Sequence, residues 1–284
     1  MMRKLFGKIH LWLSLPLGLI ISVICLTGAL LVFEQDITKA LQRELYTVTP
    51  PSEGAQPLSP SRLTELLGPQ VADTLHVTSI RVSDNPHEAA FASFRETGKR
   101  RLSIDPYTGD VKGWIQSYPF FQTVKKIHRW LLDPPPSKGQ KSVGKVIVGV
   151  TTLVMVVILI SGLIIWIPRS RKALKSRLSV SVTKGWRRFW YDSHVALGFY
   201  CMIFLLLMAL TGLTWSFGWY RDAAWSLFGE GADAQTLKRL FYSLHTGSWG
   251  GMVTKVLYFI AALIGGILPL SGYYLWWKRR TPRR

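Results

Sequence analysis

The sequence is poor in cysteine and in acidic residues. Its 284 residues include two cysteines, Cys25 and Cys201, and 16 acidic residues against 35 lysines and arginines. Two cysteines inside apolar runs provide no disulfide framework and most simply fill apolar space, and no CxxCH motif for covalent haem attachment occurs. The composition also excludes a disordered or collagen-like chain, because 48% of the residues are hydrophobic.

Charge is almost absent from four long stretches of the chain. These are residues 11–33, 146–167, 195–217 and 256–277. Each is long enough to cross a hydrocarbon core of about 30 Å as a helix that rises 1.5 Å per residue. We therefore predict four transmembrane helices, which argues against a soluble globular enzyme.

The basic residues are concentrated in segments that contain no acid. Three precede the first apolar run, eight lie between Arg169 and Arg188, and five follow Trp277, whereas residues 34–141 carry 14 bases and 12 acids. Cytoplasmic loops are enriched in lysine and arginine, so both termini and the 168–190 loop are predicted to be cytoplasmic. The net charge of +19 then reflects membrane topology and not nucleic-acid binding. The first apolar run is too long for a cleaved signal peptide.

A polar segment lies between the first two apolar runs. Four prolines at positions 50, 51, 57 and 60 mark a linker, and residues 61–67 resemble a short helix. Residues 76–83, 89–96 and 100–104 resemble strands separated by turns. These patterns predict a small periplasmic α+β domain. His76 and His87 lie in it without neighbours at metal-ligand spacing, so we assign them no role.

These patterns predict an all-α membrane protein of four transmembrane helices, arranged as two duplicated helix pairs, with the α+β domain inserted after the first helix. The expected segments are a first transmembrane helix (1–34), the periplasmic domain (35–120), a histidine segment with the second helix (121–167), a basic cytoplasmic loop (168–193), the third helix (194–217), a periplasmic loop (218–252), and the fourth helix with a basic tail (253–284).

The duplication is inferred from repeated spacings. His10 precedes Thr27-Gly28 by 17 residues, and His194 precedes Thr211-Gly212 by 17. In the second and fourth apolar runs, Lys145 precedes Ser161-Gly162 by 16 residues and Lys255 precedes Ser271-Gly272 by 16. His128 and His245 stand ahead of these two runs. Internal repeats of this kind are known in membrane folds.

The predicted topology places the four histidines in two pairs. His10 and His194 open helices that run outward and so lie near the cytoplasmic face, while His128 and His245 precede helices that run inward and so lie near the periplasmic face. A bis-histidine haem between helices needs at least two imidazoles at the same depth in the membrane. Isolated interfacial histidines are often structural, but four at matched depths favour cofactor ligation.

Glycines and bases fit the same hypothesis. Seventeen helical residues rise about 25 Å, which brings Gly28 and Gly212 level with the outer histidines, and Gly162 and Gly272 would end beside the inner ones. There they are candidates to give a porphyrin room. Candidate partners for haem propionates are Arg187 and Arg188 inside, and Lys125, Lys126, Arg129, Lys238 and Arg239 outside. Ordinary helix packing and interfacial anchoring explain these individual residues equally well.

Four segments of the sequence are distinctive: GKIHLW at 7–12, LTG at 26–28, SIDPYTGDV at 103–111 and IHRWLL at 127–132. Together they resemble the PepSY-associated transmembrane family of bacterial inner-membrane proteins, which includes ferric-siderophore reductases. The resemblance implies a di-haem b protein of the bacterial inner membrane that passes electrons to iron(III) in a periplasmic chelate. It also implies that His10 and His194 hold an inner haem, and that His128 and His245 hold an outer one.

The implied activity is that of a ferric-siderophore reductase with an electron donor that is a separate, unidentified cytoplasmic or membrane molecule. An aromatic set is a candidate docking surface or, equally, an interfacial belt: Trp215, Trp219, Tyr220, Trp225 and Trp249. Three alternatives stay open. They are a haem-free PepSY-type binding or regulatory module, a permease for siderophore or haem, and a quinol-linked di-haem cytochrome with another acceptor.

Overall fold

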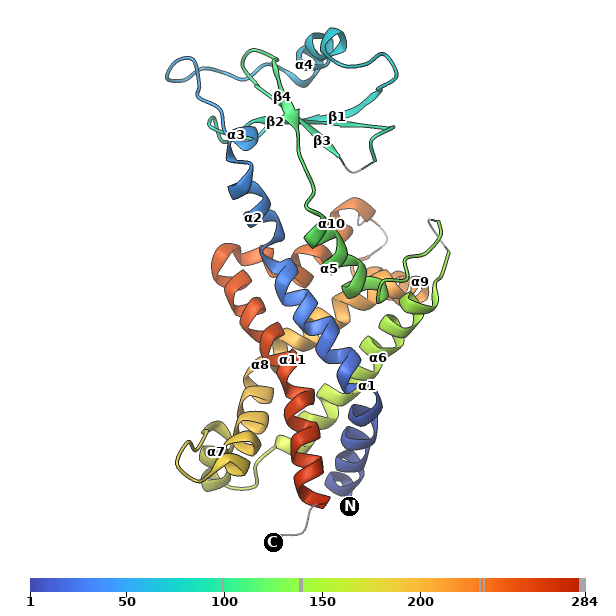
Figure 1. The fold of residues 1–284 in the computed structure, drawn as a ribbon, viewed down its shortest axis with the longest axis vertical. Coiled ribbons are helices and arrows are strands. Elements are labelled where there is room, and N and C mark those ends of the chain that lie inside the picture. Colours follow the sequence, from blue (N-terminus) through green and yellow to red (C-terminus); the bar gives the residue numbers. More distant parts are fainter. Residues whose placement is uncertain (99, 138–139, 230, 232, 281–284) are drawn as a thin grey trace. The chain divides into compact units, whose positions relative to one another are not determined.

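Four long apolar helices dominate the computed structural model, which describes residues 1–98, 100–137, 140–229, 231 and 233–280 (Figure 1). Within these residues, four segments are long and apolar enough to cross a membrane: Met2–Leu41, Val143–Trp166, Trp186–Ser216 and Ser248–Arg280. The chain is therefore a multi-pass membrane protein by helix length and composition. Each long helix begins before its predicted apolar run, because polar and basic residues extend it at its N-terminal end.

The four helices form a bundle in the first of two compact units, which comprises Met1–Phe33 and Thr123–Arg284. Helices α1 (Met2–Val32) and α8 (Trp186–Ser216) each pack against both α6 (Val143–Trp166) and α11 (Gly251–Arg280). Glycine permits the close approach of α1 to α11, since a Cβ atom at Gly18 would lie 2.7 Å from the Tyr273 hydroxyl oxygen. That hydroxyl donates to the Leu15 carbonyl at 2.7 Å.

Shorter helices connect the long ones. Helices α5 (Pro119–Trp130) and α10 (Ala234–Thr246) precede α6 and α11, while α7 (Arg171–Leu178) and α9 (Gly218–Ser226) flank α8, and a 3₁₀ turn covers Ser248–Gly250. The Asp233 side chain caps α10 by accepting from the Thr236 amide, and Gly247 ends it in the left-handed conformation. The predicted basic tail ends at 281–284, which lie outside the described residues.

The second compact unit, Glu34–Gln122, contains a small antiparallel sheet. Its strands are β1 (Val77–Arg81), β2 (Ala90–Phe94), β3 (Arg101–Ile104) and β4 (Val111–Trp114), paired in sequence order. Its helices are α2 (Glu34–Leu41), α3 (Arg43–Tyr46) and α4 (Pro60–Leu67), followed by a 3₁₀ turn at Gly68–Gln70. The sequence predicted three strands and missed β4, a four-residue strand that contains both lysine and glycine.

Alternation along the strands builds the core of this unit. Ala90, Ala92 and Phe94 of β2 are buried, whereas the residues between them are partly exposed. Leu63 and Leu67 of α4 are fully buried and belong to the same cluster. One face of the sheet thus packs against an amphipathic helix, as expected for a strand pattern with a period of two.

The Asp-Pro-Tyr-Thr-Gly segment is a structural turn between β3 and β4. The Asp105 carboxylate accepts from the amide of Tyr107 at 2.8 Å. Gly109 adopts a φ of +82°, and a Cβ atom there would also lie 2.7 Å from Leu66 Cδ1. Glycine is therefore required at this position by both backbone conformation and packing.

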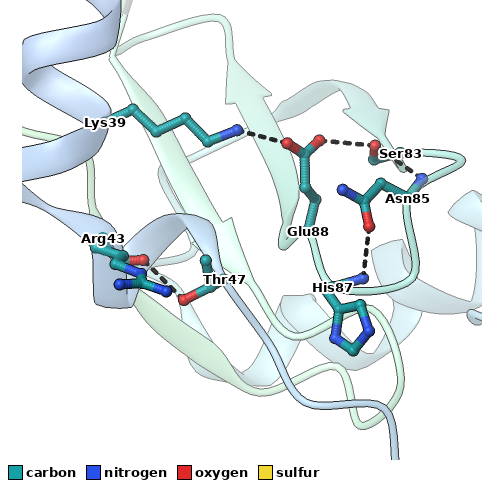
Figure 2. Close-up of polar contacts among 7 residues, drawn as sticks. All are labelled: Lys39, Arg43, Thr47, Ser83, Asn85, His87 and Glu88. Carbon is teal, nitrogen blue, oxygen red and sulfur yellow. Dashed lines mark hydrogen bonds and ion pairs between the residues drawn. The ribbon is translucent and has the colours of Figure 1, made fainter.

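A polar clasp joins α2 to the loop after β1 (Figure 2). Glu88 accepts from Lys39 at 2.5 Å and from the Ser83 hydroxyl at 2.8 Å, while the His87 amide donates to the Asn85 side chain at 3.0 Å. Hydrogen bonding from Lys39 is the main reason that the pKa of Glu88 lies below its ordinary value. The clasp stabilises the loop in its observed conformation.

Candidate functional site

The four histidines singled out by the sequence lie in two close pairs within the bundle unit. The ring centroids of His10 and His194 are 6.3 Å apart, with the ring planes perpendicular. Those of His128 and His245 are 6.2 Å apart, with an interplanar angle of 53°. The pairing inferred from depth is thus the pairing that the structure brings together.

The two histidines of each pair lie on different helices, and each contacts a further helix. His10 lies on α1 and His194 on α8, and they contact α6 and α11 respectively. His128 lies on α5 and His245 on α10, and they contact α1 and α8 respectively. Helices α1 and α8 therefore carry a histidine near one end and a support for another histidine near the other end.

The support has the same design in all four cases. Each support consists of three residues of one helix. The first contributes its backbone carbonyl, the second, three positions later, is a serine or threonine, and the third, which follows directly, is a glycine. All three therefore lie on the helix face that contacts the histidine ring. We call each such trio a histidine seat. The seats are Ile158/Ser161/Gly162 for His10, Leu268/Ser271/Gly272 for His194, Ile24/Thr27/Gly28 for His128, and Met208/Thr211/Gly212 for His245.

The first pair rests on seats that contain serine. His10 Nδ1 lies 3.0 Å from the Ile158 carbonyl oxygen and 3.2 Å from Ser161 Oγ. His194 Nδ1 lies 2.8 Å from Ser271 Oγ. Both serine hydroxyls donate their own proton to the backbone carbonyl three residues earlier, at 2.8 and 2.7 Å. Their oxygens are thereby left to accept from the imidazoles.

The second pair rests on seats that contain threonine. His128 Nδ1 lies 2.9 Å from the Ile24 carbonyl oxygen and 3.3 Å from Thr27 Oγ1. His245 Nδ1 lies 2.9 Å from the Met208 carbonyl oxygen and 3.1 Å from Thr211 Oγ1. The threonine hydroxyls also donate to backbone carbonyls of their own helices.

These contacts assign the protonation of the rings. A carbonyl oxygen only accepts, so the Nδ1 atom beside it carries the hydrogen and donates it. The neutral ring then has a bare Nε2 with a free lone pair. Hydrogen bonding of one ring nitrogen to fix the other for metal binding is the usual arrangement around histidine ligands.

Burial keeps the second pair neutral. Removal from water lowers the pKa of His128, and it lowers the pKa of His245 to about 4. Neutral imidazole is the form of histidine that ligates iron.

The glycines of the seats admit the imidazole edges. A Cβ atom would lie 3.0 Å from His128 Cε1 at position 28 and 3.1 Å from His245 Cε1 at position 212. At position 162 the distance to His10 Cε1 would be 3.3 Å, and at position 272 the distance to His194 Cε1 would be 3.7 Å. The glycines thus make room for the histidine rings, which is a more local role than the predicted one of making room for a porphyrin.

The separation of the rings fits a metal ion between two imidazoles. A metal–nitrogen bond of about 2.0 Å, continued about 1.1 Å to the ring centre on each side, separates the centroids by about 6.2 Å. No group of three or more His, Cys, Asp or Glu residues that would hold an ion is present in the described part of the chain. Two imidazoles fill only part of a metal's coordination sphere, so each pair would suit a cofactor that supplies the remaining ligands, and haem is such a cofactor.

A cavity of about 390 Å³ adjoins the first pair. His10 and His194 both line it, together with apolar side chains of α1, α6, α8 and α11. Arg177 and Arg279 line it as well. Of the predicted inner propionate partners, Arg188 instead donates to the buried Asp192 at 2.7 Å.

Aromatic and basic residues adjoin the second pair. The Trp215 ring lies 5.3 Å from that of His245, and the half-buried Arg129 stacks over Trp130 at 4.5 Å. Of the other aromatic residues predicted to frame a docking surface, Trp249 donates to the Tyr258 hydroxyl at 3.3 Å. His76, which was assigned no role, pairs with Glu96 at 2.8 Å in the sheet unit.

The sequence did not reveal the carbonyl and hydroxyl groups of the seats as partners of the histidines. The Thr-Gly and Ser-Gly repeats marked the seats, but the sequence did not indicate that their hydroxyls contact the histidines. Backbone carbonyls such as that of Ile24 carry no sequence signal. Nothing in the sequence distinguished Arg177 and Arg279 from the many other basic residues of the predicted cytoplasmic segments.

Comparison with known proteins agrees with this architecture. The family model of the PepSY-associated TM region matches residues 8–238 and 227–279, which includes all four histidines. No curated protein matches the sequence significantly. Because the family model covers most of the chain, the protein belongs to the PepSY-associated transmembrane family.

Proposed function

We propose that this protein is a transmembrane di-haem b electron conduit that reduces ferric-siderophore in the periplasm and releases Fe(II) for iron acquisition. It is then an oxidoreductase of the bacterial inner membrane, with cytoplasmic termini. The observation that carries the proposal is the presence of two histidine pairs whose centroids are 6.3 and 6.2 Å apart, each with Nδ1 held by its seat. Haem bound at each pair supplies one-electron redox chemistry.

The residues around the pairs fit bis-imidazole ligation. His10, His194, His128 and His245 would each offer Nε2, since their Nδ1 atoms face serine, threonine or backbone oxygens. With two imidazoles as its protein ligands, a haem would favour electron transfer over binding of a small ligand. Fixed rings also limit the structural change between oxidation states.

The spacing of the pairs along α1 supports transfer across a membrane. His10 and Thr27 are 17 residues apart on one helix, which corresponds to a rise of about 25 Å. A hydrocarbon core is about 30 Å thick, so one redox site near each face divides a distance that a single site does not span.

The region between the pairs is largely apolar, although the hydroxyls of Ser22 and Thr151 are buried there as well. Ile21, Cys25, Met155, Cys201 and Leu205 form a buried cluster there. Such a core excludes water and ions but leaves a short path for electrons. This arrangement favours electron conduction over transport of a siderophore, which needs a polar path.

The substrate class follows from the chemistry of iron. Hard oxygen ligands of siderophores prefer Fe(III), and one electron per iron produces Fe(II), which these ligands hold less tightly. The predicted topology places His128 and His245 on the periplasmic side, where the chelate would be reduced. The basic 168–190 loop supports this orientation.

The test is reoxidation of the reduced protein by a siderophore complex. Purified protein in detergent is reduced with dithionite, freed of excess reductant and mixed with a ferric-siderophore in a stopped-flow spectrometer. The matched control is the gallium(III) complex of the same siderophore, which has the same charge and shape but accepts no electron. We expect reoxidation of two haems with the iron complex alone.

Two results would overturn the proposal. Protein without haem, despite adequate haem supply during expression, would leave a PepSY-type binding module as the better hypothesis. Haem that reoxidises no faster with the ferric complex than with the gallium complex would indicate a cytochrome with another acceptor.

A further inference from the structure

The cavity beside His10 and His194 has two chemically different ends. One end lies at the middle of the bundle, where Ile21, Met155 and Leu205 line it. The other end lies where helices α6 and α11 finish, and there Trp166, Arg177 and Arg279 line it. Since Met155 and Trp166 are eleven residues apart on α6, the two ends are separated by about 16 Å.

Neither arginine at this end pairs with an acidic side chain of the described residues. No Asp or Glu occurs among the described residues that line the cavity. Arg177 donates through Nη1 to the carbonyl oxygens of Ile165, at 2.9 Å, and Trp166, which caps the last turn of α6. Its Nη2 and Nε groups make no hydrogen bond to the described residues, and neither does Arg279. A pair of guanidinium groups without a carboxylate is prepared to bind an anion.

Trp166 adds an unsatisfied donor at the same end. Its indole Nε1 is buried and has no hydrogen-bond partner among the described residues. The ring is stacked on Phe199 with centroids 3.6 Å apart and planes 3° from parallel, so stacking holds it in place. Buried donors in proteins are nearly always paired, so this N–H is left to donate to a water or to an acceptor on a ligand.

We propose that Arg177, Arg279 and the Trp166 indole form a carboxylate-binding site, which orients an amphiphilic planar ligand in this cavity. The inference rests on the proposed function and makes it more specific. The ligand is the haem held by His10 and His194, and the carboxylates are its two propionates. The apolar edge of the ring then lies toward Ile21 and Leu205, and the propionates lie at the ends of α6 and α11.

Binding of haem and of its dimethyl ester tests this site. Apoprotein that carries His128→Ala, so that only the first pair is intact, is titrated with each compound and followed by absorbance and by quenching of tryptophan fluorescence. We expect the ester, which lacks both carboxylate charges, to bind at least about tenfold more weakly than haem. A His194→Ala background shows the preference of the second pair and controls for partitioning into detergent.

Variants assign the effect to residues. Arg279→Gln should weaken haem binding about tenfold and leave ester binding unchanged, because Arg279 makes no hydrogen bond to the described residues that the substitution would remove. Arg280→Gln is the matched control, since Arg280 is adjacent, stacks over Trp276 at 4.4 Å and does not line the cavity. Trp166→Phe keeps the stacking on Phe199 and removes only the N–H donor, so it should have a smaller effect in the same direction.

The outcomes separate the two proposals. Equal affinity for haem and ester, with Arg279→Gln identical to Arg280→Gln, would overturn the carboxylate site and leave the haem hypothesis standing. Failure of the wild-type apoprotein to bind either compound would overturn the proposed function itself.

Discussion

The two histidine pairs have a common design and different details. Both present imidazoles whose centroids are about 6 Å apart, and both hold Nδ1 on a carbonyl and a hydroxyl oxygen of a neighbouring helix, with a glycine beside the ring edge. The His10–His194 pair has serine seats, perpendicular rings and a cavity with arginines, whereas the His128–His245 pair has threonine seats, rings at 53° and a tryptophan neighbour. On the proposed function, the common features are those that haem ligation would require, and the differing ones are those that would adjust a redox potential.

The largest effect is expected when one ligand is removed. His194→Ala should abolish the haem at the first pair and spare the one at the second, so the haem content falls from two per chain to one. His76→Ala is a matched control, because its ring pairs only with Glu96 in the sheet unit. Haem per chain, measured as the pyridine complex, gives the result. Loss of both haems, or of neither, would contradict the independence of the two pairs.

A methyl group added at a closely packed seat glycine should weaken haem binding at one pair and not at the other. A methyl group at position 28 would lie 3.0 Å from the His128 ring, whereas at position 272 it would lie 3.7 Å from the His194 ring, an ordinary contact. Overpacking of this kind costs about 1–3 kcal/mol, so Gly28→Ala should lower haem retention at the second pair about tenfold or more. Gly272→Ala is the comparison and should behave like wild type. Equal retention in both variants would show that the seats do not position the rings.

Removing a seat hydroxyl should have a smaller effect. Ser271 contacts His194 at 2.8 Å, whereas Thr27 contacts His128 at 3.3 Å and leaves the shorter contact to the Ile24 carbonyl. A lost hydrogen bond costs about 0.5–1.5 kcal/mol, so Ser271→Ala should weaken haem binding roughly three- to tenfold and Thr27→Ala less. Redox titration of each haem provides a second measurement, since a weaker hydrogen bond at Nδ1 raises the potential. The reverse order would mean that the carbonyls alone orient the rings.

The smallest effect is expected for a substitution at a residue that is distant in sequence from both histidine pairs. Glu88→Gln weakens the clasp with Lys39, a partly exposed ion pair worth less than about 1 kcal/mol, and should leave both haems unchanged. The pKa of Glu88 is lowered in the folded protein. Its contribution to the free energy of unfolding is therefore fully present above the ordinary glutamate pKa of about 4.3 and is lost as the pH falls below that value. Thermal unfolding followed by circular dichroism should therefore show a difference between variant and wild type at pH 7 that shrinks at pH 4. A difference that grows on acidification would contradict this assignment.

Long apolar runs and spacing could be predicted from sequence because they are periodic. The four candidate membrane-spanning helices follow from residues such as those of 146–167, and the Thr-Gly and Ser-Gly repeats together with the predicted topology located both histidine pairs. The interpretation of two duplicated helix pairs and the placement of the sheet unit in the periplasm stay predictions.

The features that sequence did not reveal depend on the backbone and on distant contacts. Strand β4 is short and owes its pairing to β3 rather than to its own propensity, since Gly113 and Lys112 disfavour strands. The Ile158 carbonyl contacts His10 only because α1 and α6 pack together. Arg177 and Arg188 have the same sequence character, yet one lines the cavity and the other pairs with Asp192.

The central claim is that each histidine pair holds one haem through two imidazoles. Low-temperature electron paramagnetic resonance of the oxidised protein, with haem quantified per chain, tests it most directly. Two low-spin haems are predicted, and the perpendicular rings of His10 and His194 should give the more anisotropic signal, because perpendicular ligand planes leave two iron d orbitals nearly equal in energy. High-spin haem, one haem in the intact chain, or none would contradict the account.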